Sequence, residues 1–452
     1  MIYLKLRSVG DWTHAKSQAI SVSLLLCGLV VATPISVAQS SKLDLSGFAT
    51  LGASWTDNSE LGYQSDLTVR DGAYSDRVSF TSLSVAGLQA RYHLSEQLSF
   101  VAQGVLRPAN SVTDIDSLRI ASLNYAWTPD TQVRIGRFVP SLYNETDSRY
   151  VGYSRAAVTA NQEFYGAVPL PFVDGIDLSH TKALTTGLLG INFWYGQSEF
   201  EVFYPFNDEP FTFDLNQFGG LSLSWQYDNI SIRSSYVQGN QRRAAPIAAA
   251  GIEVADQLIA LNTPGAVQVR SALSNTQGPF RYGSLGIHYD NGSWSLQSEL
   301  GQFSSDSIVS PDNRSAYATV ARTFDRWTLF GSLGSIRSDT SGLELGPPQY
   351  FADFELLTGE SIADINAQVD LFNRSLAAGY DQFGASFGAK LWLSKQVALK
   401  AQYDYKRLDL RLSNLWEQAR RLEQLSTNRF NRQAESGDEE INVLHLTVDV
   451  IF

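Results

Sequence analysis

The sequence predicts an all-β protein, a transmembrane antiparallel up-and-down β-barrel of about sixteen strands. Three observations lead to this prediction. After a short leader, stretches of about ten residues alternate apolar and polar side chains. The connectors between these stretches alternate between short and long. No part of the chain after the leader approaches the roughly 18 consecutive apolar residues of a membrane helix, so a membrane-spanning chain of this kind must form a closed barrel.

The N-terminus has the composition of a secretory signal peptide. It contains three basic residues before its apolar run: Lys5, Arg7 and Lys16. The apolar run extends from Ile20 to Ala32, and the small residues of Ser36-Val37-Ala38 predict cleavage after Ala38. We therefore expect residues 1–38 to be removed and residues 39–452 to form one barrel domain.

The leader also holds the only cysteine, Cys27. A lipoprotein leader is the alternative, although Leu26 precedes this cysteine where a small residue is needed. Removal of the leader leaves no thiol for catalysis, metal binding or a disulfide. It also removes three basic residues and one acidic residue, which changes the formal net charge from −12 to −14. This acidity argues against nucleic-acid binding, which depends on neutralising phosphates.

The last ten residues contain the clearest strand. Alternate side chains share one face, which carries Leu444, Leu446, Val448, Val450 and Phe452. The opposite face carries His445, Thr447 and Asp449. A strand with one apolar and one mostly polar face suits a wall between lipid and water. A half-buried strand of a soluble sandwich gives the same alternation, so this stretch alone leaves both alternatives open.

Sixteen such stretches can be placed along the chain. Their approximate ranges are 43–55, 81–94, 98–107, 118–127, 132–139, 176–180, 188–200, 221–227, 230–238, 281–289, 294–303, 316–324, 327–336, 383–393, 397–408 and 443–452. Seven connectors are short turns and eight are long loops, in strict alternation. All long loops therefore lie at one end, as in bacterial outer-membrane barrels, and an even strand count places both termini at the other.

The predicted width has a functional consequence. A barrel of sixteen strands is too wide to be filled by the side chains of its wall and leaves an aqueous channel. Aromatic residues lie close to the short turns, where their rings can occupy the lipid–water interface: Tyr92, Trp127, Tyr227, Tyr289, Trp294, Trp327 and Trp392. Both features favour a water-filled membrane channel.

The closing strand carries a family resemblance. An apolar residue at every second position back from the C-terminal Phe452 resembles the last strand of Gram-negative outer-membrane porins. The motif is short and is shared by many barrel families. The resemblance implies outer-membrane localisation, a homotrimer, and passive diffusion of small hydrophilic solutes and ions, with no cofactor, no metal and no nucleic-acid partner. The alternatives are a substrate-specific channel or receptor with a loop-closed mouth and, from another class, a barrel enzyme or adhesin.

The lumen face can be assigned wherever the apolar face is clear. This places three arginines inside the barrel: Arg91, Arg107 and Arg134. The connector after residue 139 occupies the same place in the order as the porin loop that folds into the barrel. The resemblance therefore implies that Glu145 and Asp147 face these arginines across a pore constriction, which would produce a transverse field. A solvated surface loop is the alternative.

Two positions disturb the alternation. Leu83 and Val85 are out of phase with the residues that follow, which predicts a bulge near Gly87. Arg137 falls on the lipid face, so it must lie near the rim of the barrel or indicate an error of phase. Strand 397–408 is regular and turns four polar residues inward: Lys400, Gln402, Asp404 and Lys406.

Catalysis and metal binding find little support. Gly384-Ala385-Ser386-Phe387-Gly388 matches the hydrolase nucleophile pattern, but that chemistry needs a strained turn between strand and helix. Alternation through this segment predicts the middle of a strand instead. The histidines after the leader show no metal-ligand spacing: His93, His180, His288 and His445. Two loops have helical character, one over Ile252 to Leu261 and one with Leu415, Ala419, Leu422 and Leu425 at helical spacing.

Overall fold

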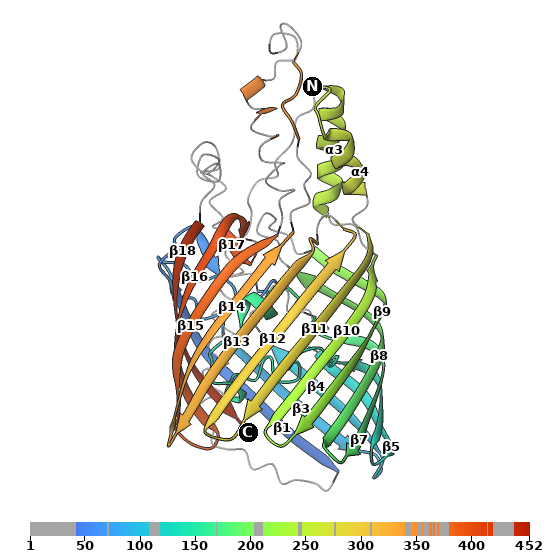
Figure 1. The fold of residues 1–452 in the computed structure, drawn as a ribbon, viewed down its shortest axis with the longest axis vertical. Helices are drawn as coiled ribbons and strands as arrows, with labels where there is room; N and C mark the ends of the chain where they lie inside the picture. Colours follow the sequence, from blue (N-terminus) through green and yellow to red (C-terminus); the bar gives the residue numbers. More distant parts are fainter. Residues whose placement is uncertain are drawn as a thin grey trace.

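The computed structural model describes most of the chain after the leader. The described residues are 42–69, 72–107, 118–168, 170–202, 211–242, 246–274, 277–307, 310–339, 345–350, 355, 361–363, 365–366, 369, 379–413, 415–418 and 438–452. The predicted signal peptide and its cleavage site lie outside these residues. The described residues form a closed antiparallel barrel (Figure 1).

Sixteen strands make up the barrel wall, as predicted. Their bounds are β1 (Leu43–Thr56), β3 (Val85–His93), β4 (Leu98–Leu106), β5 (Leu118–Thr128), β6 (Thr131–Phe138), β7 (Val173–Leu184), β8 (Gly187–Val202), β9 (Phe211–Tyr227), β10 (Ile230–Gln241), β11 (Gly278–Asp290), β12 (Trp294–Ser305), β13 (Asn313–Phe324), β14 (Trp327–Ser338), β15 (Tyr380–Trp392), β16 (Val397–Ser413) and β18 (Asp438–Ile451). Each strand pairs with its neighbours in chain order, and the first pairs with the last. The predicted fold class and strand count are confirmed.

The pairing of β1 with β18 closes the barrel. The register runs from Phe48 opposite Ile451 to Thr56 opposite Val443. Two backbone hydrogen bonds between Gly47 and Phe452 extend the pairing to the C-terminal residue, at 2.8 and 3.0 Å. The C-terminus lies at the end with the short turns, and the long connectors join the strands at the opposite end (Figure 1). Closure leaves the sheet without an unpaired edge.

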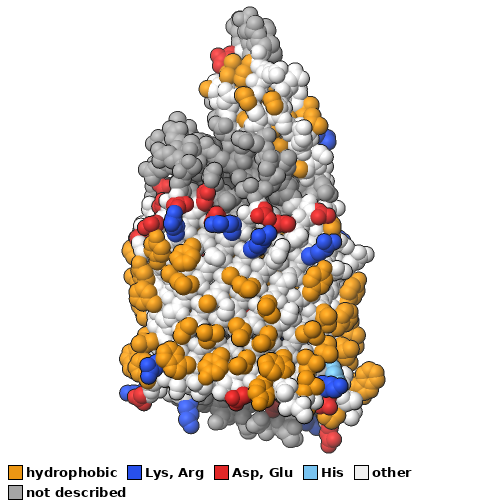
Figure 2. Space-filling view, in the orientation of Figure 1, with side chains coloured by type: hydrophobic (Ala, Val, Ile, Leu, Met, Phe, Trp, Pro, Cys, Tyr) orange, Lys and Arg blue, Asp and Glu red, His pale blue; other side chains and the backbone are white. Residues whose placement is uncertain are grey.

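The two faces of the wall differ as the alternation predicts. On β18, Leu444 and Leu446 point outward and are 48% and 57% exposed, whereas His445 and Thr447 point inward and are buried. Hydrophobic side chains cover the outer wall in a broad belt, and a band of charged residues lies above it, toward the long loops (Figure 2). This belt suits contact with the hydrocarbon of a membrane.

The predicted bulge near Gly87 is wrong. β3 begins at Val85 and pairs with β1 in unbroken register. Val85 points into the lumen, where it is buried with Phe48 and Val105 beneath Tyr150 and Val151 of a loop inside the barrel. An apolar residue on the lumen face therefore produced the apparent change of phase.

Arg137 lies near the rim of the barrel, which is the first of the two alternatives that the sequence left open. It occupies the second-last position of β6, at the end of the strand that leads into a long loop. Its guanidinium binds both carboxylate oxygens of Asp174 at 2.8 Å and stacks 3.7 Å over the ring of Phe172. An ion pair at the rim stays in contact with water. Arg137 is therefore compatible with a strand face that meets lipid further down.

Two helices rise above the barrel from one long connector. They are α3 (Pro246–Ala260) and α4 (Ala266–Ser274), which pack against each other (Figure 1). The helical prediction for Ile252 to Leu261 is therefore confirmed. In the other predicted loop, β17 (Trp416–Gln418) pairs with β2 (Leu61–Tyr63), and the positions from Ala419 onward lie outside the described residues. Among the described helices, none combines the length and the apolar character needed to cross a membrane.

Neighbouring residues on β3 test which face meets lipid. We expect Leu88→Arg to lower the free energy of unfolding in lipid vesicles by about 2–4 kcal/mol, because Leu88 points outward and is 54% exposed. The matched control is Gln89→Arg, because Gln89 points into the lumen and accepts a hydrogen bond from Gln103. Urea unfolding of vesicle-inserted protein measures both changes, and equal destabilisation by the two variants would contradict the assignment of faces.

Candidate functional site: a loop folded into the barrel

The connector between β6 and β7 lies inside the barrel. We call residues 139–172 the inner loop. It contains a 3-10 turn, η1 (Gly152–Ser154), and a short helix, α2 (Gln162–Tyr165), which contact different stretches of the wall. The turn contacts β1 and β18, and the helix contacts β12 to β15. The inner loop therefore crosses the lumen, as the resemblance implied for this connector.

The turn is held to the wall by a buried lysine. Lys400 on β16 donates to the carbonyl oxygens of Gly152 and Ala157, at 2.7 and 2.8 Å. Its ammonium also pairs with Asp449 on β18 at 3.0 Å, and both side chains are almost fully buried. A Cβ on Gly152 would lie 2.3 Å from Asp449 Oδ1, so only glycine allows the loop this close to the wall.

The helix is held by a second buried lysine. Asn161 caps α2 by accepting a hydrogen bond from the backbone N–H of Phe164. Glu163, in the first turn, pairs with Lys406 on β16 at 2.7 Å and accepts a hydrogen bond from Gln382. Removing one member of such a buried pair would leave the other charge unpaired, at a cost of about 3–5 kcal/mol. The pair therefore fixes the position of α2.

A buried carboxylate on β12 connects the inner loop to another part of the wall. Glu299 on β12 accepts hydrogen bonds from the hydroxyls of Tyr165 and Tyr317, the latter at 2.7 Å. It also accepts one from the backbone N–H of Asn144 at 2.9 Å. Two segments of the inner loop, near residues 144 and 165, are thus tied to the same side chain.

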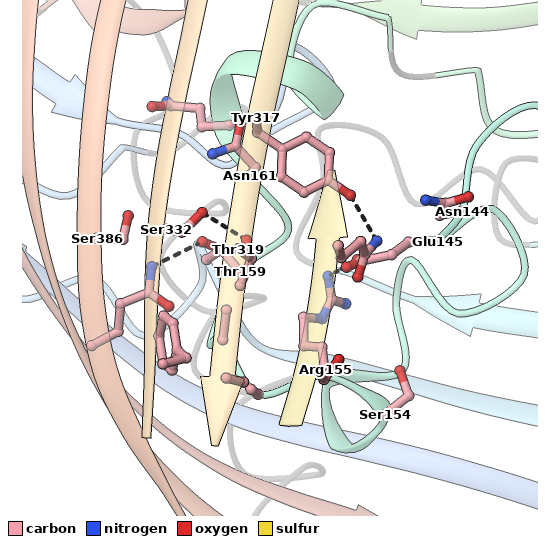
Figure 3. Close-up of a pocket in the computed structure, with 18 of the residues that line it drawn as sticks. Asn144, Glu145, Ser154, Arg155, Thr159, Asn161, Tyr317, Thr319, Ser332 and Ser386 are labelled. Carbon is pink, nitrogen blue, oxygen red and sulfur yellow. Dashed lines mark hydrogen bonds and ion pairs between the residues drawn. The ribbon is translucent and has the colours of Figure 1, made fainter. Parts of the chain in front are cut away.

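The inner loop and strands β11 to β16 enclose a polar chamber of about 240 Å³ (Figure 3). The chamber extends from Asp290 and Ser295, near the short-turn end, to Gln162 and Lys406 beside α2. Most of its lining side chains carry hydroxyl or amide groups: Asn144, Ser148, Ser154, Thr159, Asn161, Gln162, Ser295, Gln297, Tyr317, Thr319, Ser332, Ser386 and Gln402. Such a lining can exchange hydrogen bonds with water and with polar solutes.

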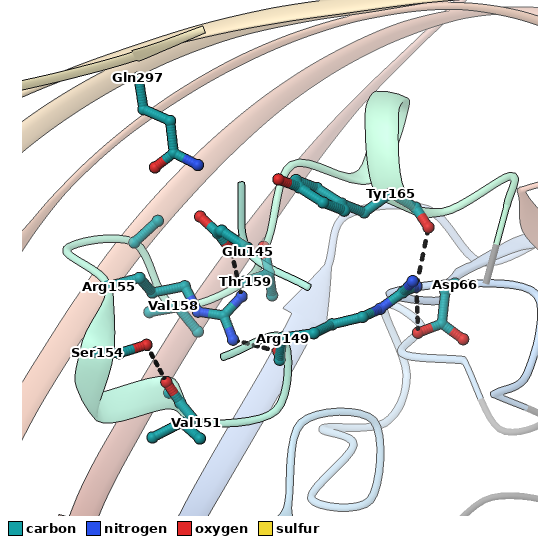
Figure 4. A network of polar contacts seen from close by, with 12 residues as sticks. Asp66, Glu145, Arg149, Val151, Ser154, Arg155, Val158, Thr159, Tyr165 and Gln297 are labelled. Atoms are coloured by element: carbon teal, nitrogen blue, oxygen red, sulfur yellow. Dashed lines mark hydrogen bonds and ion pairs between the residues drawn. The ribbon is translucent and has the colours of Figure 1, made fainter. Parts of the chain in front are cut away.

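The charged groups near the chamber are largely paired. Glu145 forms an ion pair with Arg155 of the same loop at 3.1 Å (Figures 3 and 4). Asp404 accepts a hydrogen bond from Gln402 and lies 3.3 Å from His445. The chamber therefore presents neutral hydrogen-bonding groups more than free charge.

Within the described residues, three of the five predicted constriction residues pair with groups outside the predicted set: Glu145, Arg107 and Arg134. Arg107 pairs with Asp66 at 3.2 Å, and Arg134 pairs with Asp177 at 2.9 Å. Arg91 is exposed at the short-turn end of β3, and Asp147 is exposed on the inner loop. The buried carboxylates that pair with Arg107 and Arg134 are consistent with an inward orientation of these two arginines, and the inward orientation of Arg91 stays a prediction. A transverse field between the two acids and these arginines stays a prediction.

The first loop contributes a residue that the sequence did not single out. Asp66 binds Arg107 on the wall. It also binds Arg149 of the inner loop, which donates in addition to the carbonyl oxygen of Tyr165 (Figure 4). Tyr150 lies beneath the guanidiniums of Arg107 and Arg119, at 4.5 and 4.2 Å. Three arginines thus surround one carboxylate and one tyrosine. No periodic pattern marks Asp66, because it lies in an irregular connector.

The same arrangement changes the pKa of Asp66. Burial alone would raise the pKa of this carboxyl, but Arg107, Arg149 and hydrogen bonds from Thr68 outweigh burial and lower it from 3.8 to about 2. A carboxyl with a lowered pKa stabilises the fold above its unfolded pKa. The stabilisation is lost as the pH falls through the folded value.

Ser386 and Ser54 both lie in places that do not suit catalysis. Ser386 lies in the middle of β15, as predicted, and not at a strained turn. Elsewhere, Ser54 lies 2.8 Å from His445 Nδ1, and His445 Nε2 lies 3.3 Å from Asp404. The ring of Tyr63 covers this histidine at 4.7 Å, and all four side chains are buried, so no substrate can reach the hydroxyl. Among the described residues, no cluster of three or more His, Cys, Asp or Glu could hold a metal ion.

Comparisons with known proteins found similar solved structures but no similar sequence. No family model and no curated protein sequence matches the chain. OmpT of Vibrio cholerae has a similar fold, with a TM-score of 0.48 and 10% identity, over 92% of this chain and 100% of that chain. The outer membrane channel DcaP of Acinetobacter baumannii gives 0.49 and 11%, over 91% and 97%.

A third similar structure is an anion-selective porin from Comamonas acidovorans. Its TM-score is 0.47 at 12% identity, over 91% of this chain and 100% of that chain. The class of protein follows from the chain's own pairing, which defines a sixteen-stranded barrel with an inner loop across its lumen.

The Asp66 network can be tested by pH. We expect Asp66→Asn to lower the free energy of unfolding at pH 7, because Arg107 and Arg149 lose their counter-charge. The difference from the unmodified protein should be constant above about pH 5 and shrink by about 2 kcal/mol as the pH falls to about 2. Urea unfolding curves across this range measure it.

The control for this experiment is Asp130→Asn, in an exposed short turn. It should change the free energy of unfolding by no more than about 0.5 kcal/mol at pH 7. If Asp66→Asn lowered the free energy of unfolding as much at pH 2 as at pH 7, the carboxylate would not be held by these arginines.

Proposed function

We propose that the protein is an outer-membrane channel through which small hydrophilic solutes and ions diffuse down their gradients. The observation that carries this proposal is the contrast between the two sides of one closed wall. Its outer face carries a hydrophobic belt, and its inner face encloses a chamber lined by hydroxyl and amide groups. A barrel of this strand number leaves an aqueous lumen, and the inner loop restricts it at mid-height.

Permeation through such a lumen requires no catalytic group and no cofactor. Selection depends on the width left by the inner loop and on the groups that line it. The lysines that hold the loop are themselves buried against backbone carbonyls and carboxylates, so they fix the width without adding free charge to the passage.

One observation favours a substrate-specific channel as a second candidate. The first loop and the segment after β16 also enter the barrel, where β2 and β17 form a small sheet. Tyr63 and Trp416 of this sheet are fully buried, and their rings pack edge to face at 5.7 Å. A lumen filled to this extent suits recognition of a particular solute more than free passage of any small one.

Planar-bilayer recording and a glycine substitution test the proposal. We expect the purified protein to give discrete conductance steps in potassium chloride, and Gly152→Ala to increase the step, because its Cβ would push η1 off the wall. The matched control is Gly283→Ala on β11, where the nearest atom to an added Cβ lies 4.0 Å away. Conductance in this control should be unchanged, and a protein without any conductance would refute the channel.

Vesicle swelling separates the two candidates. Uptake of sugars of graded size should fall smoothly with size for a general diffusion channel. A preference unrelated to size would indicate the substrate-specific alternative.

We also propose a homotrimer, as the resemblance to porins implies. The mass of the detergent-solubilised particle, corrected for detergent, is expected to be three times that of the mature chain. A monomeric mass in mild detergent would contradict this assembly.

A further inference from the structure

The lumen contains a second cavity with a different lining. It has a volume of about 100 Å³ and lies between the inner loop and the inward faces of β8 to β13, toward the long loops. Its lining is mainly apolar and includes Phe200, Val202, Phe213, Leu215, Phe218, Val237, Phe280, Tyr282 and Phe303. We call this cavity the aromatic pocket. Among its described lining residues there is no Lys, Arg, Asp or Glu.

At the level of the aromatic pocket, the wall has an apolar inner face and a polar outer face. On β8, Phe200 and Val202 point inward and are buried, whereas Glu199 points outward and is exposed. Lower on the same strand, Phe193 points outward and is 50% exposed, and Asn192 points inward. The strands therefore extend beyond the hydrophobic belt. An apolar lining here is not needed to pass hydrophilic solutes, so it calls for another explanation.

The rings around the aromatic pocket present parallel faces. Phe200 and Phe213 are stacked with centroids 5.7 Å apart and planes 12° apart. Phe280 and Phe303 are stacked at 6.0 Å and 21°. Phe218 leans toward Phe280 at 5.6 Å. Aromatic pairs gain about 0.5–1.5 kcal/mol beyond their buried area, and a further flat ring can add to such an arrangement.

The aromatic pocket adjoins the polar chamber through the inner loop. Leu142 lines the pocket, and Asn144, two residues further along, lines the chamber. Tyr143 lies between them and packs edge to face on Tyr282 at 5.6 Å and on Phe164 at 5.6 Å. Neighbouring residues of the inner loop thus line an apolar site and a hydrogen-bonding site.

We propose that the aromatic pocket binds the aromatic ring of an amphipathic solute whose remaining part is neutral and hydrophilic. This inference rests on the proposed channel function and names its solute class. The size of the cavity is of the order that holds one six-membered ring. Because the described lining has no charged group, it selects a neutral ring. The buried Ser310 Oγ has no partner among the described residues and can form a hydrogen bond with a substituent on the ring.

A pair of glucosides isolates the contribution of the ring. Phenyl β-glucoside and methyl β-glucoside share the same hydrophilic part and differ in the group that would enter the pocket. We expect the folded, detergent-solubilised protein to bind the phenyl compound at least tenfold more tightly, as measured by titration calorimetry. Equal affinity for the two glucosides would overturn the proposal.

Substitutions locate the binding site. Val237→Phe fills the aromatic pocket and Phe303→Ala removes one of its stacked rings, so each should reduce the phenyl preference at least threefold. The matched control is Phe193→Ala, which removes a ring of the same size from the outer face of β8, where it is 50% exposed, and should leave the preference unchanged. A preference that survives both pocket variants, or that is lost equally in the control, would place ring binding elsewhere and refute the assignment.

Conductance measurements in potassium chloride distinguish a failure of the pocket proposal from a failure of the proposed channel function. A protein that conducts but does not distinguish the glucosides would refute the pocket alone. A protein that binds the phenyl compound without conducting would refute the channel function on which the solute class rests.

Discussion

The structure depends on one constraint, which is that no backbone N–H or C=O group can remain unpaired inside a lipid bilayer. A sheet meets this constraint only when its first strand pairs with its last. The pairing of β1 with β18, carried to the final residue by the hydrogen bonds between Gly47 and Phe452, provides that closure. The side-chain pattern follows from it, because a closed wall separates an outer lipid face from an inner aqueous face.

A wall of this circumference cannot fill its own interior, and the chain fills part of it with loops. Lys400 and Lys406 show how the loops are held, because each lysine is buried against loop carbonyl or carboxylate oxygens. Charges in such positions are costly unless they are paired, so they fix one arrangement of the inner loop. The polar chamber and the aromatic pocket are two of the spaces that this arrangement leaves among the described residues, and their linings differ in polarity.

The sequence predicted the strands well because lipid and water impose a period of two on every strand that separates them. The prediction failed where the inner face of a strand contacts a loop instead of water. Val85 suggested a bulge because the inner loop covers it, and the start of β9 was placed at Leu221 instead of Phe211 because apolar residues line the lumen there. Lys400 and Asp449 could both be assigned inward, but their ion pair depends on the register between strands, which composition does not reveal.

The position of the anchoring lysines along the chain affects the order of assembly. Lys400 and Gly152 are separated by 248 residues, and the aspartate that neutralises the lysine belongs to the last strand. Contacts between such distant segments form slowly, since most of the chain must be in place before they can be made. The passage through this barrel therefore takes its final shape at the end of folding, when the closing strand docks.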